Sequence, residues 1–564
     1  MSYLMTYNCI FIQKMDTFNL LTRSSDETKQ VSSSLRQIGC CERCILRNLG
    51  ELNPTSYKST PQEIERTLLP EELWSSSSVN QCPCPSCLGI LQQFADDDYL
   101  LKILSNVQKD GYQFSNYQCS LILPVSLLVR QKALFIFLQN KFGNTYKGHE
   151  TKIASVKDVW KWSCGFRLGQ LLGANFQNRS EFDILMTFTY KDSDKECAFL
   201  LDHLPDTFRK RKQRKFGFET FTRANVAKAL DSMSDSKLED CVTCPPAVPT
   251  TECVCDVSCS HDAVFIAGRY QKYSRELSQT PWMIEGKRIM EGSVQEIICE
   301  PIIETFKPTD HRLSSSGRED VDVRMLGIGR PFVVELINPH CVKFSKEDLV
   351  QLQKRINSVS KDVKVRDLQI VTREDTNNLK EGEIDKTKTY SATCWCEREI
   401  TDKDMEMLGG IKDLTLQQKT PLRVLHRRTA ATRERIIHSL HVDKLTSCRF
   451  KLQLTTQAGT YVKEFVHGDF GRTSPNMIEL LKAECDIIDL DVESVNVEWP
   501  PLIDPVQSDN RNLDDERNSQ DSQPLLIDKC VDKLQSSISV NGQNGAVLEK
   551  LADKQLITGE MKIE

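Results

Sequence analysis

The side chains most able to do chemistry lie in the stretch from residue 314 to residue 327. Asp320 follows a guanidinium, Arg318, by two positions, in a segment that is too polar to form part of a core. A carboxylate beside a cation in a polar segment is typical of a catalytic or binding site. Solvated ion pairs on a surface loop are the plain alternative, because exposed pairs of this kind are common. The other segments of the chain decide between the two interpretations.

The composition limits the classes of protein to which the chain can belong. Its 564 residues, 39% of them hydrophobic, are enough for two to four soluble domains. The net charge of −6 argues against uniform coating of nucleic acid but allows local basic patches. No apolar run approaches the roughly 18 residues needed to cross a bilayer, so we expect no membrane insertion. Without a recognisable secretory leader, the 22 cysteines indicate a reducing, intracellular protein in which clustered cysteines bind metal.

Two Cys-x-x-Cys pairs near the amino terminus have the spacing of metal ligands. A tetrahedral zinc site needs four thiolates at about 2.3 Å, and each short pair already places two sulfurs side by side. Because Cys40 and Cys82 are additional thiols and the loop between the pairs is long, buried or free thiols are the alternative. We predict a structural Zn²⁺ ion, and its expected ligands are Cys41, Cys44, Cys84 and Cys87.

Changes in pattern along the chain predict its domains. Residues 1–30 have the composition of a flexible leader, and residues 31–240 that of an α+β module containing the cysteine pairs. Residues 241–263 are rich in Pro and Cys and are interpreted as a linker that runs into a strand. Residues 264–505 alternate strand and helix patterns, which predicts a mixed sheet with helices on one side. Residues 506–564 are polar, which is typical of a disordered tail.

Hydrophobic periodicity and capping residues predict the individual elements. Ser293 and Ser345 each precede an acid by three positions, which indicates helix starts. Further helices are expected at 126–138 and 156–168, and strands at 119–123, 182–188, 332–337, 363–371, 450–454, 488–492 and 495–499.

Two basic segments have the charge density to contact phosphates. The run at 209–215 is equally compatible with RNA binding, a nuclear import signal and a solvated loop. The second segment, at 419–435, is interrupted by apolar residues and is by itself equally a basic helix face or an RNA-docking element. Its basic residues are Lys419, Arg423, His426, Arg427, Arg428, Arg433 and Arg435.

Three segments of the second domain resemble the catalytic motifs of pseudouridine synthases. Residues 317–320 are similar to the Gly-Arg-x-Asp signature that carries the catalytic aspartate. Residues 386–390 are similar to the segment that supplies an active-site tyrosine, and residues 457–465 resemble the Gly-Thr-Tyr strand that supplies the basic partner of the aspartate. The wider sequence resembles the Pus-ten type of tRNA pseudouridine synthase of archaea and eukaryotes at residues 267–275, 279–282, 418–428 and 467–473.

This resemblance covers roughly residues 30–505. It implies an α+β protein with a mixed-sheet pseudouridine synthase catalytic domain, preceded by a zinc-binding, THUMP-like RNA-binding domain. It also implies isomerisation of uridine in the TΨC loop of tRNA, at uridine-55 and/or uridine-54, without an organic cofactor. The expected partners are tRNA and other structured RNA, and the expected location is the nucleus and the cytoplasm.

The resemblance also implies roles for single residues. Asp320 is expected to act as an ionised nucleophile or base, because a neutral acid can neither attack nor remove a proton. Lys463 is expected to hold that carboxylate charged, and Arg318 is a second possible partner. Tyr390 is expected to stack on the flipped uracil and to accept its C5 proton. Glu319 and Asp322 are expected to be structural or solvated acids, and the substrate-binding set is Tyr390, Tyr461, Arg318, Arg423, Arg427 and Arg428.

The leading hypothesis is therefore a tRNA-uridine isomerase. An RNA-binding scaffold for structured RNA precursors, which needs no turnover, is the alternative from another class. A zinc-dependent nucleic-acid enzyme is a weaker third hypothesis, because four cysteines leave no open coordination position for water.

Overall fold

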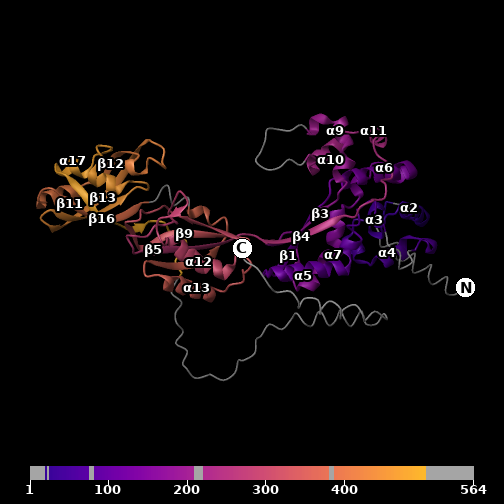
Figure 1. The fold of residues 1–564 in the computed structure, drawn as a ribbon, viewed down its shortest axis with the longest axis horizontal. Helices are drawn as coiled ribbons and strands as arrows, with labels where there is room; N and C mark the ends of the chain where they lie inside the picture. Colours follow the sequence, from indigo (N-terminus) through magenta and orange to yellow (C-terminus); the bar gives the residue numbers. More distant parts are fainter. Residues whose placement is uncertain (1–19, 22–23, 75–81, 209–219, 380–386, 504–564) are drawn as a thin grey trace, which may run out of the picture. The chain divides into compact units, whose positions relative to one another are not determined.

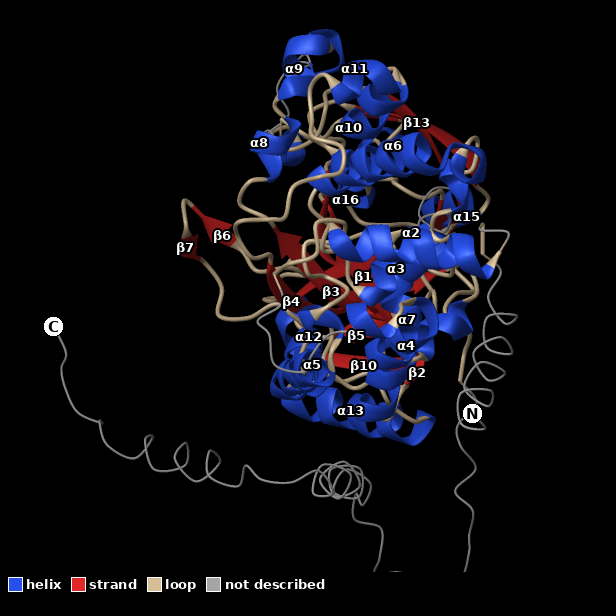
Figure 2. Cartoon of the chain, turned by 90° about the vertical axis from the view of Figure 1, so that its right-hand side faces the viewer, coloured by secondary structure: helices blue, strands red, loops and turns tan. Residues whose placement is uncertain are grey.

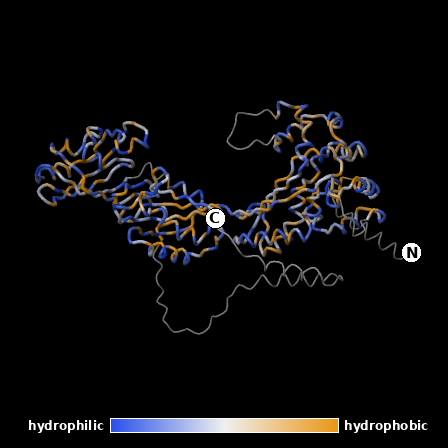
Figure 3. Tube along the Cα trace, viewed as in Figure 1, coloured by the Kyte–Doolittle hydropathy of each residue, from blue (hydrophilic) through white to orange (hydrophobic). Residues whose placement is uncertain are grey.

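The computed structural model of the chain describes residues 20–21, 24–74, 82–208, 220–379 and 387–503 (Figure 1). The basic run at 209–215, the polar tail at 506–564 and most of the leader lie outside the described residues. The buried apolar residues form two main cores, one drawn from residues 31–253 and the other from residues 266–497. Apolar segments coloured orange in Figure 3 run along the strands of both sheets. No helix in the described ranges is long and apolar enough to span a membrane.

The amino-terminal part combines many helices with a small sheet. Its strands are β1 (Asn116–Ile122), β2 (Asn175–Phe176), β3 (Phe182–Thr189) and β4 (Val254–His261). Its helices are α2 (Ser25–Gln37), α3 (Glu42–Asn48), α4 (Pro61–Leu68), α5 (Asp97–Asp110), α6 (Ser126–Tyr146), α7 (Val156–Leu172), α8 (Ser193–Cys197), α9 (Phe199–His203), α10 (Arg223–Asp231) and α11 (Asp235–Glu239).

The four strands of this sheet lie in the order β2-β1-β3-β4, with β3 and β4 antiparallel and the other pairs parallel. The predicted strands and helices between residues 119 and 188 are confirmed. One predicted boundary differs from the structure. Helix α2 begins inside the expected leader, where the Ser24 side chain accepts a hydrogen bond from the Glu27 amide. Residues 254–261 form β4, in agreement with the expected linker that runs into a strand, and their alternating side chains complete the edge of the sheet.

The carboxy-terminal part is built on one large sheet. Its helices are α12 (Val294–Phe306), α13 (Lys346–Val359), α15 (Asp402–Gly409), α16 (Val462–His467) and α17 (Met477–Leu481), and η6 (Leu422–Val424) is a 3₁₀ turn. Its strands are β5 (Val264–Lys272), β6 (Met283–Ile284), β7 (Lys287–Arg288), β8 (Asp310–Ser315), β9 (Val323–Ile337), β10 (Val363–Val371), β11 (Lys388–Cys396), β12 (Lys412–Lys419), β13 (Thr432–Thr446), β14 (Arg449–Thr456), β15 (Thr473–Ser474) and β16 (Cys485–Val495).

The large sheet has ten strands, in the order β10-β5-β9-β16-β11-β14-β13-β12-β15, and β8 pairs with β9 outside this path. All of its pairs are antiparallel except β9 and β16, so the predicted mixed sheet is confirmed. Helices α12 and α13 lie against the β5–β10 end of the sheet (Figure 2). The parallel pair is what brings the start of β9, and the loop before it, beside the centre of the sheet.

The capping residues predict the helix starts correctly, since Ser293 and Ser345 cap α12 and α13. The strand predicted at 495–499 is wrong. Strand β16 ends at Val495, and the following segment turns away so that the Val497 carbonyl accepts a hydrogen bond from the Arg269 guanidinium.

Candidate active site

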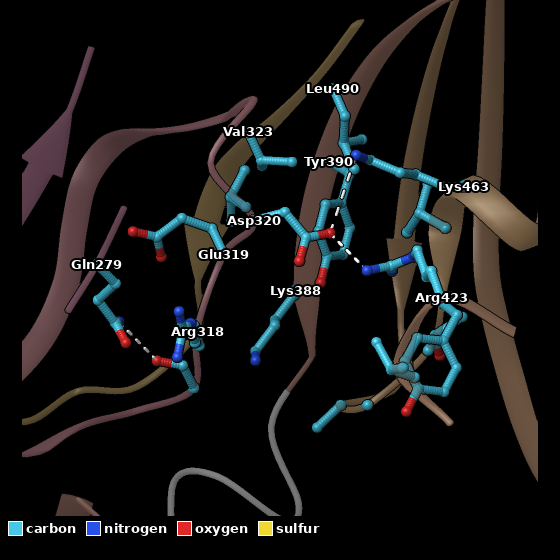
Figure 4. A pocket seen from close by; sticks show the side chains of 18 of the residues that line it. Gln279, Arg318, Glu319, Asp320, Val323, Lys388, Tyr390, Arg423, Lys463 and Leu490 are labelled. Atoms are coloured by element: carbon cyan, nitrogen blue, oxygen red, sulfur yellow. Dashed lines mark hydrogen bonds and ion pairs between the residues drawn. The ribbon is translucent and has the colours of Figure 1, made fainter. Parts of the chain in front are cut away.

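A cavity of about 790 Å³ collects the candidate catalytic side chains of the second domain (Figure 4). Strand pairing explains why they meet. Val323, at the start of β9, is the register partner of Leu490 on β16, and Val492 on β16 is the partner of Tyr390 on β11. The loop that carries Asp320 enters β9, so this acid lies over the strand that carries Tyr390. The residues 320 and 390, distant in sequence, therefore share one cavity.

The carboxylate of Asp320 faces three cations. The nearest is Arg423, whose Nη1 donates to Asp320 Oδ2 at 2.7 Å. Lys463 Nζ lies 3.9 Å from the same oxygen, and Arg427 Nη2 lies 4.0 Å from Oδ1. The Asp320 side chain is one-third exposed, so it can be reached from the cavity. Three cations therefore surround this acid where it lines the cavity.

Arg423 is itself held in place by a buried acid. Its Nε donates to Glu464 Oε1 at 2.7 Å, and the Glu464 side chain is 2% exposed. Burial disfavours the charge on Arg423, but the hydrogen bond with Glu464 and the charges of Glu464 and Asp320 raise the pKa of Arg423 above its usual value. Arg423 therefore remains a cation whose position is fixed before substrate arrives.

Lys463 has a closer partner than the one expected for it. Its Nζ donates to Asp322 Oδ2 at 2.6 Å, and although burial would raise the pKa of Asp322, this bond lowers it. Lys463 lies on helix α16 and not on a strand, because β14 ends at Thr456. Arg318 lines the cavity, but among the described residues it has no ion pair with Asp320.

The basic segment at 419–435 is not a helix, since it consists of the end of β12, the η6 turn, a loop and the start of β13. Arg427, Arg428, Arg433 and Arg435 line the cavity together with Arg423, and Tyr461 also lines it. No sequence pattern indicates that Arg423 is the direct partner of Asp320, because 103 positions separate them.

Tyr390 and Lys388 come from the same strand and line the cavity near Arg318 (Figure 4). Burial raises the pKa of Tyr390, although the charge of Arg330 opposes this, so the phenol stays protonated. Gly317 allows Lys388 to approach, because its φ of +90° suits glycine and a Cβ atom there would lie 2.9 Å from Lys388 Nζ.

A fully buried ion pair supports the loop that carries Asp320. Arg330 Nε donates to Glu319 Oε2 at 2.8 Å, and their side chains are 2% and 0% exposed. The Tyr270 hydroxyl lies 2.8 Å and 2.9 Å from the two Glu319 oxygens, and Gln279 Nε2 donates to Tyr270 and to the Gly317 carbonyl. Glu319 therefore has the structural position of a buried anchor, and its neighbour Asp320 faces the cavity.

A buried lysine completes this support. The Nζ atom of Lys272 donates to the carbonyls of Leu277, Asp320 and Val321 at 2.8, 3.1 and 2.8 Å, which uses all three of its protons. Burial lowers the pKa of Lys272 from 10.5 to about 8, and the charges of Glu319, Asp322 and Asp320 oppose this change while that of Arg330 adds to it.

We expect the contribution of Lys272 to stability to depend on pH. Between its folded pKa of about 8 and its unfolded value of 10.5, the unfolded chain binds more protons, so stability rises with pH across this window and falls as the pH drops through 8. The free energy of unfolding can be measured with urea at pH 7.5 and at pH 10. Between these two pH values, the free energy of unfolding of the wild type should rise on the order of 1–3 kcal/mol more than that of Lys272→Met. An equal difference at both pH values would contradict this assignment.

The cysteine pairs of the amino-terminal part form a second candidate site. The ligand atoms of Cys41, Cys44, Cys84 and Cys87 lie within 4.8 Å of one another, and all four residues are buried. The amides of Cys41 and Leu91 donate to the sulfurs of Cys84 and Cys87 at 3.4 and 3.5 Å, as expected for sulfurs that carry negative charge. The donor set therefore fits a thiolate-bound metal ion, and it is the predicted set.

Known proteins are similar to both parts of this chain. A family model described as "Pus10, C-terminal" matches residues 265–496, and one described as "Eukaryotic Pus10, N-terminal" matches residues 84–259. The tRNA pseudouridine synthase Pus10 of Homo sapiens is 40% identical over 527 residues, and that of Xenopus laevis is 39% identical over 515 residues. Each alignment covers 85% of this chain and 99% of the relative. The archaeal Pus10 of Methanocaldococcus jannaschii is 34% identical over 285 residues, 48% of this chain and 60% of the relative.

The catalytic motifs, the cavity that collects them and these relatives define an isomerase of the pseudouridine synthase class. Similarity of this extent, over both parts of the chain, decides the family as well. The chain belongs to the Pus10 family.

Proposed function

We propose that this chain isomerises uridine to pseudouridine in the TΨC loop of tRNA, at uridine-55 and/or uridine-54, with Asp320 as the catalytic carboxylate. The observation that carries the proposal is the Asp320 carboxylate, open to the cavity and bonded to Arg423 at 2.7 Å. The names of the relatives support tRNA as the substrate. The nuclear and cytoplasmic location expected from the sequence stays a prediction.

The proposed reaction replaces one bond between sugar and base with another. The C1′–N1 bond breaks, the uracil turns, and a C1′–C5 bond forms; the proton leaves C5, and N1 ends protonated. Asp320 is placed to act as nucleophile at the sugar or as base in this sequence. Arg423 and Lys463 lie 2.7 and 3.9 Å from its Oδ2 atom and hold it in position for this role.

Tyr390 is proposed to form one wall of the uracil pocket. Because its phenol is held protonated by burial, stacking of its ring on the flipped base is better supported than removal of the C5 proton by its hydroxyl. Lys388, which also lines the cavity, can donate to a carbonyl of the uracil.

The arginines of the cavity rim are proposed to bind the RNA backbone. Extrusion of a base costs roughly a few kcal/mol, least in a loop, and contacts with phosphates offset this cost. Arg427 and Arg428 line the cavity within the same segment as Arg423, and Arg318 and Tyr461 line it from other elements.

The test is release of tritium from a tRNA transcript labelled at C5 of its uridines, because isomerisation must expel the C5 hydrogen. Transcripts with cytidine at position 54, at position 55 or at both locate the target. We expect tritium release from the unchanged transcript and none from the transcript with cytidine at both positions. Binding without release, where a control synthase is active, would favour the RNA-scaffold alternative.

We further propose that Cys41, Cys44, Cys84 and Cys87 hold a structural Zn²⁺ ion that fastens helix α3 to the 84–91 segment of an RNA-binding domain. The closed thiolate set and its burial support zinc in a structural and not a catalytic role.

Loss of one ligand should release this zinc and loosen the domain. Cys84→Ser is expected to lower the zinc content from one ion per chain to about none and to lower the first thermal transition, because metal binding contributes directly to folding. Elemental analysis and calorimetry measure both effects. Cys164→Ser, which changes a fully buried cysteine in the same core, is the control and should keep its zinc. Full zinc content in Cys84→Ser would contradict the proposed ligand set.

A further inference from the structure

Phe470 is the most exposed large apolar side chain of the described ranges. It is 94% exposed, whereas the next such residue, Phe166, is 61% exposed. Removal of apolar surface from water is the main contribution that a phenyl ring makes to folding, and a ring left in water makes almost none. Packing within the domain therefore does not explain Phe470.

The backbone at Phe470 adopts a conformation that phenylalanine disfavours. Asp469, Phe470 and Gly471 have successive φ values of 48°, 57° and 77°. Bulky L-residues rarely adopt positive φ, and such strain persists where the surrounding structure imposes it, commonly at functional sites. Residues 467–472 therefore form a strained turn that exposes the ring of Phe470 to solvent.

Hydrogen bonds attach this turn to the rim of the cavity. The Arg472 guanidinium donates to the Thr420 carbonyl at 2.6 Å, and the Leu422 amide donates to Asp469 Oδ2 at 3.3 Å. Leu422 precedes Arg423, the residue that contacts Asp320 directly. The 467–472 turn is therefore bonded to the segment that also carries the cavity-lining residues Arg423, Arg427 and Arg428.

The surface around the turn combines apolar and basic character. Leu422 and Leu425 are 47% and 38% exposed, and Arg427 and Arg428 from the same segment line the cavity. Apolar side chains among arginines match the two surfaces of a single-stranded nucleic acid, namely the flat faces of its bases and its phosphates.

We propose that the ring of Phe470 stacks on a nucleobase of the substrate RNA next to the target uridine, outside the cavity. Extrusion of the target removes a stacking partner from its neighbour, and an aromatic ring replaces that partner without reading its sequence. The fixed turn places the ring in advance, so little ordering is needed when RNA binds. This inference rests on the proposed function and adds a binding residue to it.

Binding of a tRNA transcript by the full chain tests the inference. Phe470→Ala should weaken binding by roughly 5- to 100-fold, the range observed for loss of one base-stacking aromatic residue. Phe470→Tyr and Phe470→Trp should bind within about threefold of the wild type, whereas Phe470→Leu should resemble Phe470→Ala because it keeps apolar area without an aromatic face.

Two further variants separate stacking from a structural role. Phe470→Gly relieves the positive φ, so its melting temperature should equal or exceed that of Phe470→Ala while its RNA binding is equally weak. Trp395→Ala removes another exposed aromatic ring, 39% exposed and near the end of β11, and should bind RNA like the wild type.

The inference is overturned if Phe470→Ala binds like the wild type, if Phe470→Leu binds like Phe470→Tyr, or if Trp395→Ala weakens binding as much as Phe470→Ala. Its failure is distinguishable from failure of the proposed function. A wild type that binds tRNA but releases no tritium refutes the isomerase, and the comparison of binding among the Phe470 variants still decides the role of the ring.

Discussion

Asp320→Ala should lower the rate of tritium release by at least about a thousandfold, because no other acid among the described residues of the cavity is placed to replace the missing carboxylate. Glu319 also lines the cavity, but its carboxylate is buried and held by Arg330 and Tyr270, and Asp322 is bonded to Lys463. RNA binding should not weaken, since the substitution removes a negative charge that faces Arg423, Lys463 and Arg427 and leaves those cations free for phosphates.

Single-turnover kinetics and a binding titration with the same transcript measure the two effects separately. Asp322→Ala is the matched control, because it removes an acid two positions away whose side chain is 64% exposed, and we expect it to cost less than about tenfold. Asp320→Ala with turnover near that of the wild type would show that the catalytic carboxylate lies elsewhere.

The second large effect is expected at the buried ion pair of Glu319 and Arg330, which supports the loop that carries Asp320. Glu319→Gln should lower the free energy of unfolding by about 3–5 kcal/mol, because it leaves the Arg330 charge buried without a partner. Turnover should fall as well, because the same cluster of hydrogen bonds holds the loop that carries Asp320. In this cluster Arg330 Nη1 donates to the Ser316 carbonyl and the Tyr270 hydroxyl donates to Glu319. Denaturant unfolding followed in the carboxy-terminal domain measures the loss.

A surface control and a double variant sharpen this test. Glu335→Gln removes an acid that lies 3.4 Å from Arg373 with side chains 23% and 66% exposed, and it should change stability by less than about 0.5 kcal/mol. Glu319→Leu combined with Arg330→Met replaces both charges by apolar groups and should regain most of the lost stability while turnover stays low. If Glu319→Gln is as stable as Glu335→Gln, the pair does not support the loop.

The motif at 317–320 contains two adjacent acids, and their different environments come from the loop that leads into β9. Glu319 is buried against Arg330, while Asp320 opens to the cavity, and the type of residue alone does not distinguish them. The resemblance to a known family identified Asp320 as the candidate catalytic acid. The structure shows why Glu319 is a poor candidate, since its carboxylate is buried and paired with Arg330.

The local features could be predicted from the amino-acid sequence. They are the cysteine spacing of the four-thiolate set, the capping residues that start α12 and α13, the alternation that produces β1, β3 and β10, and the motifs that resemble the family. These depend on residues close together in the chain, where spacing alone fixes the geometry. The three-dimensional fold alone shows that Arg423 contacts Asp320 directly, that Lys463 bonds to Asp322, and that Phe470 stands exposed on a turn bonded to residues 420 and 422. Strand order and the parallel pairing of β9 with β16 bring together residues that lie more than a hundred positions apart in the chain. Local sequence patterns do not predict which distant strands pair.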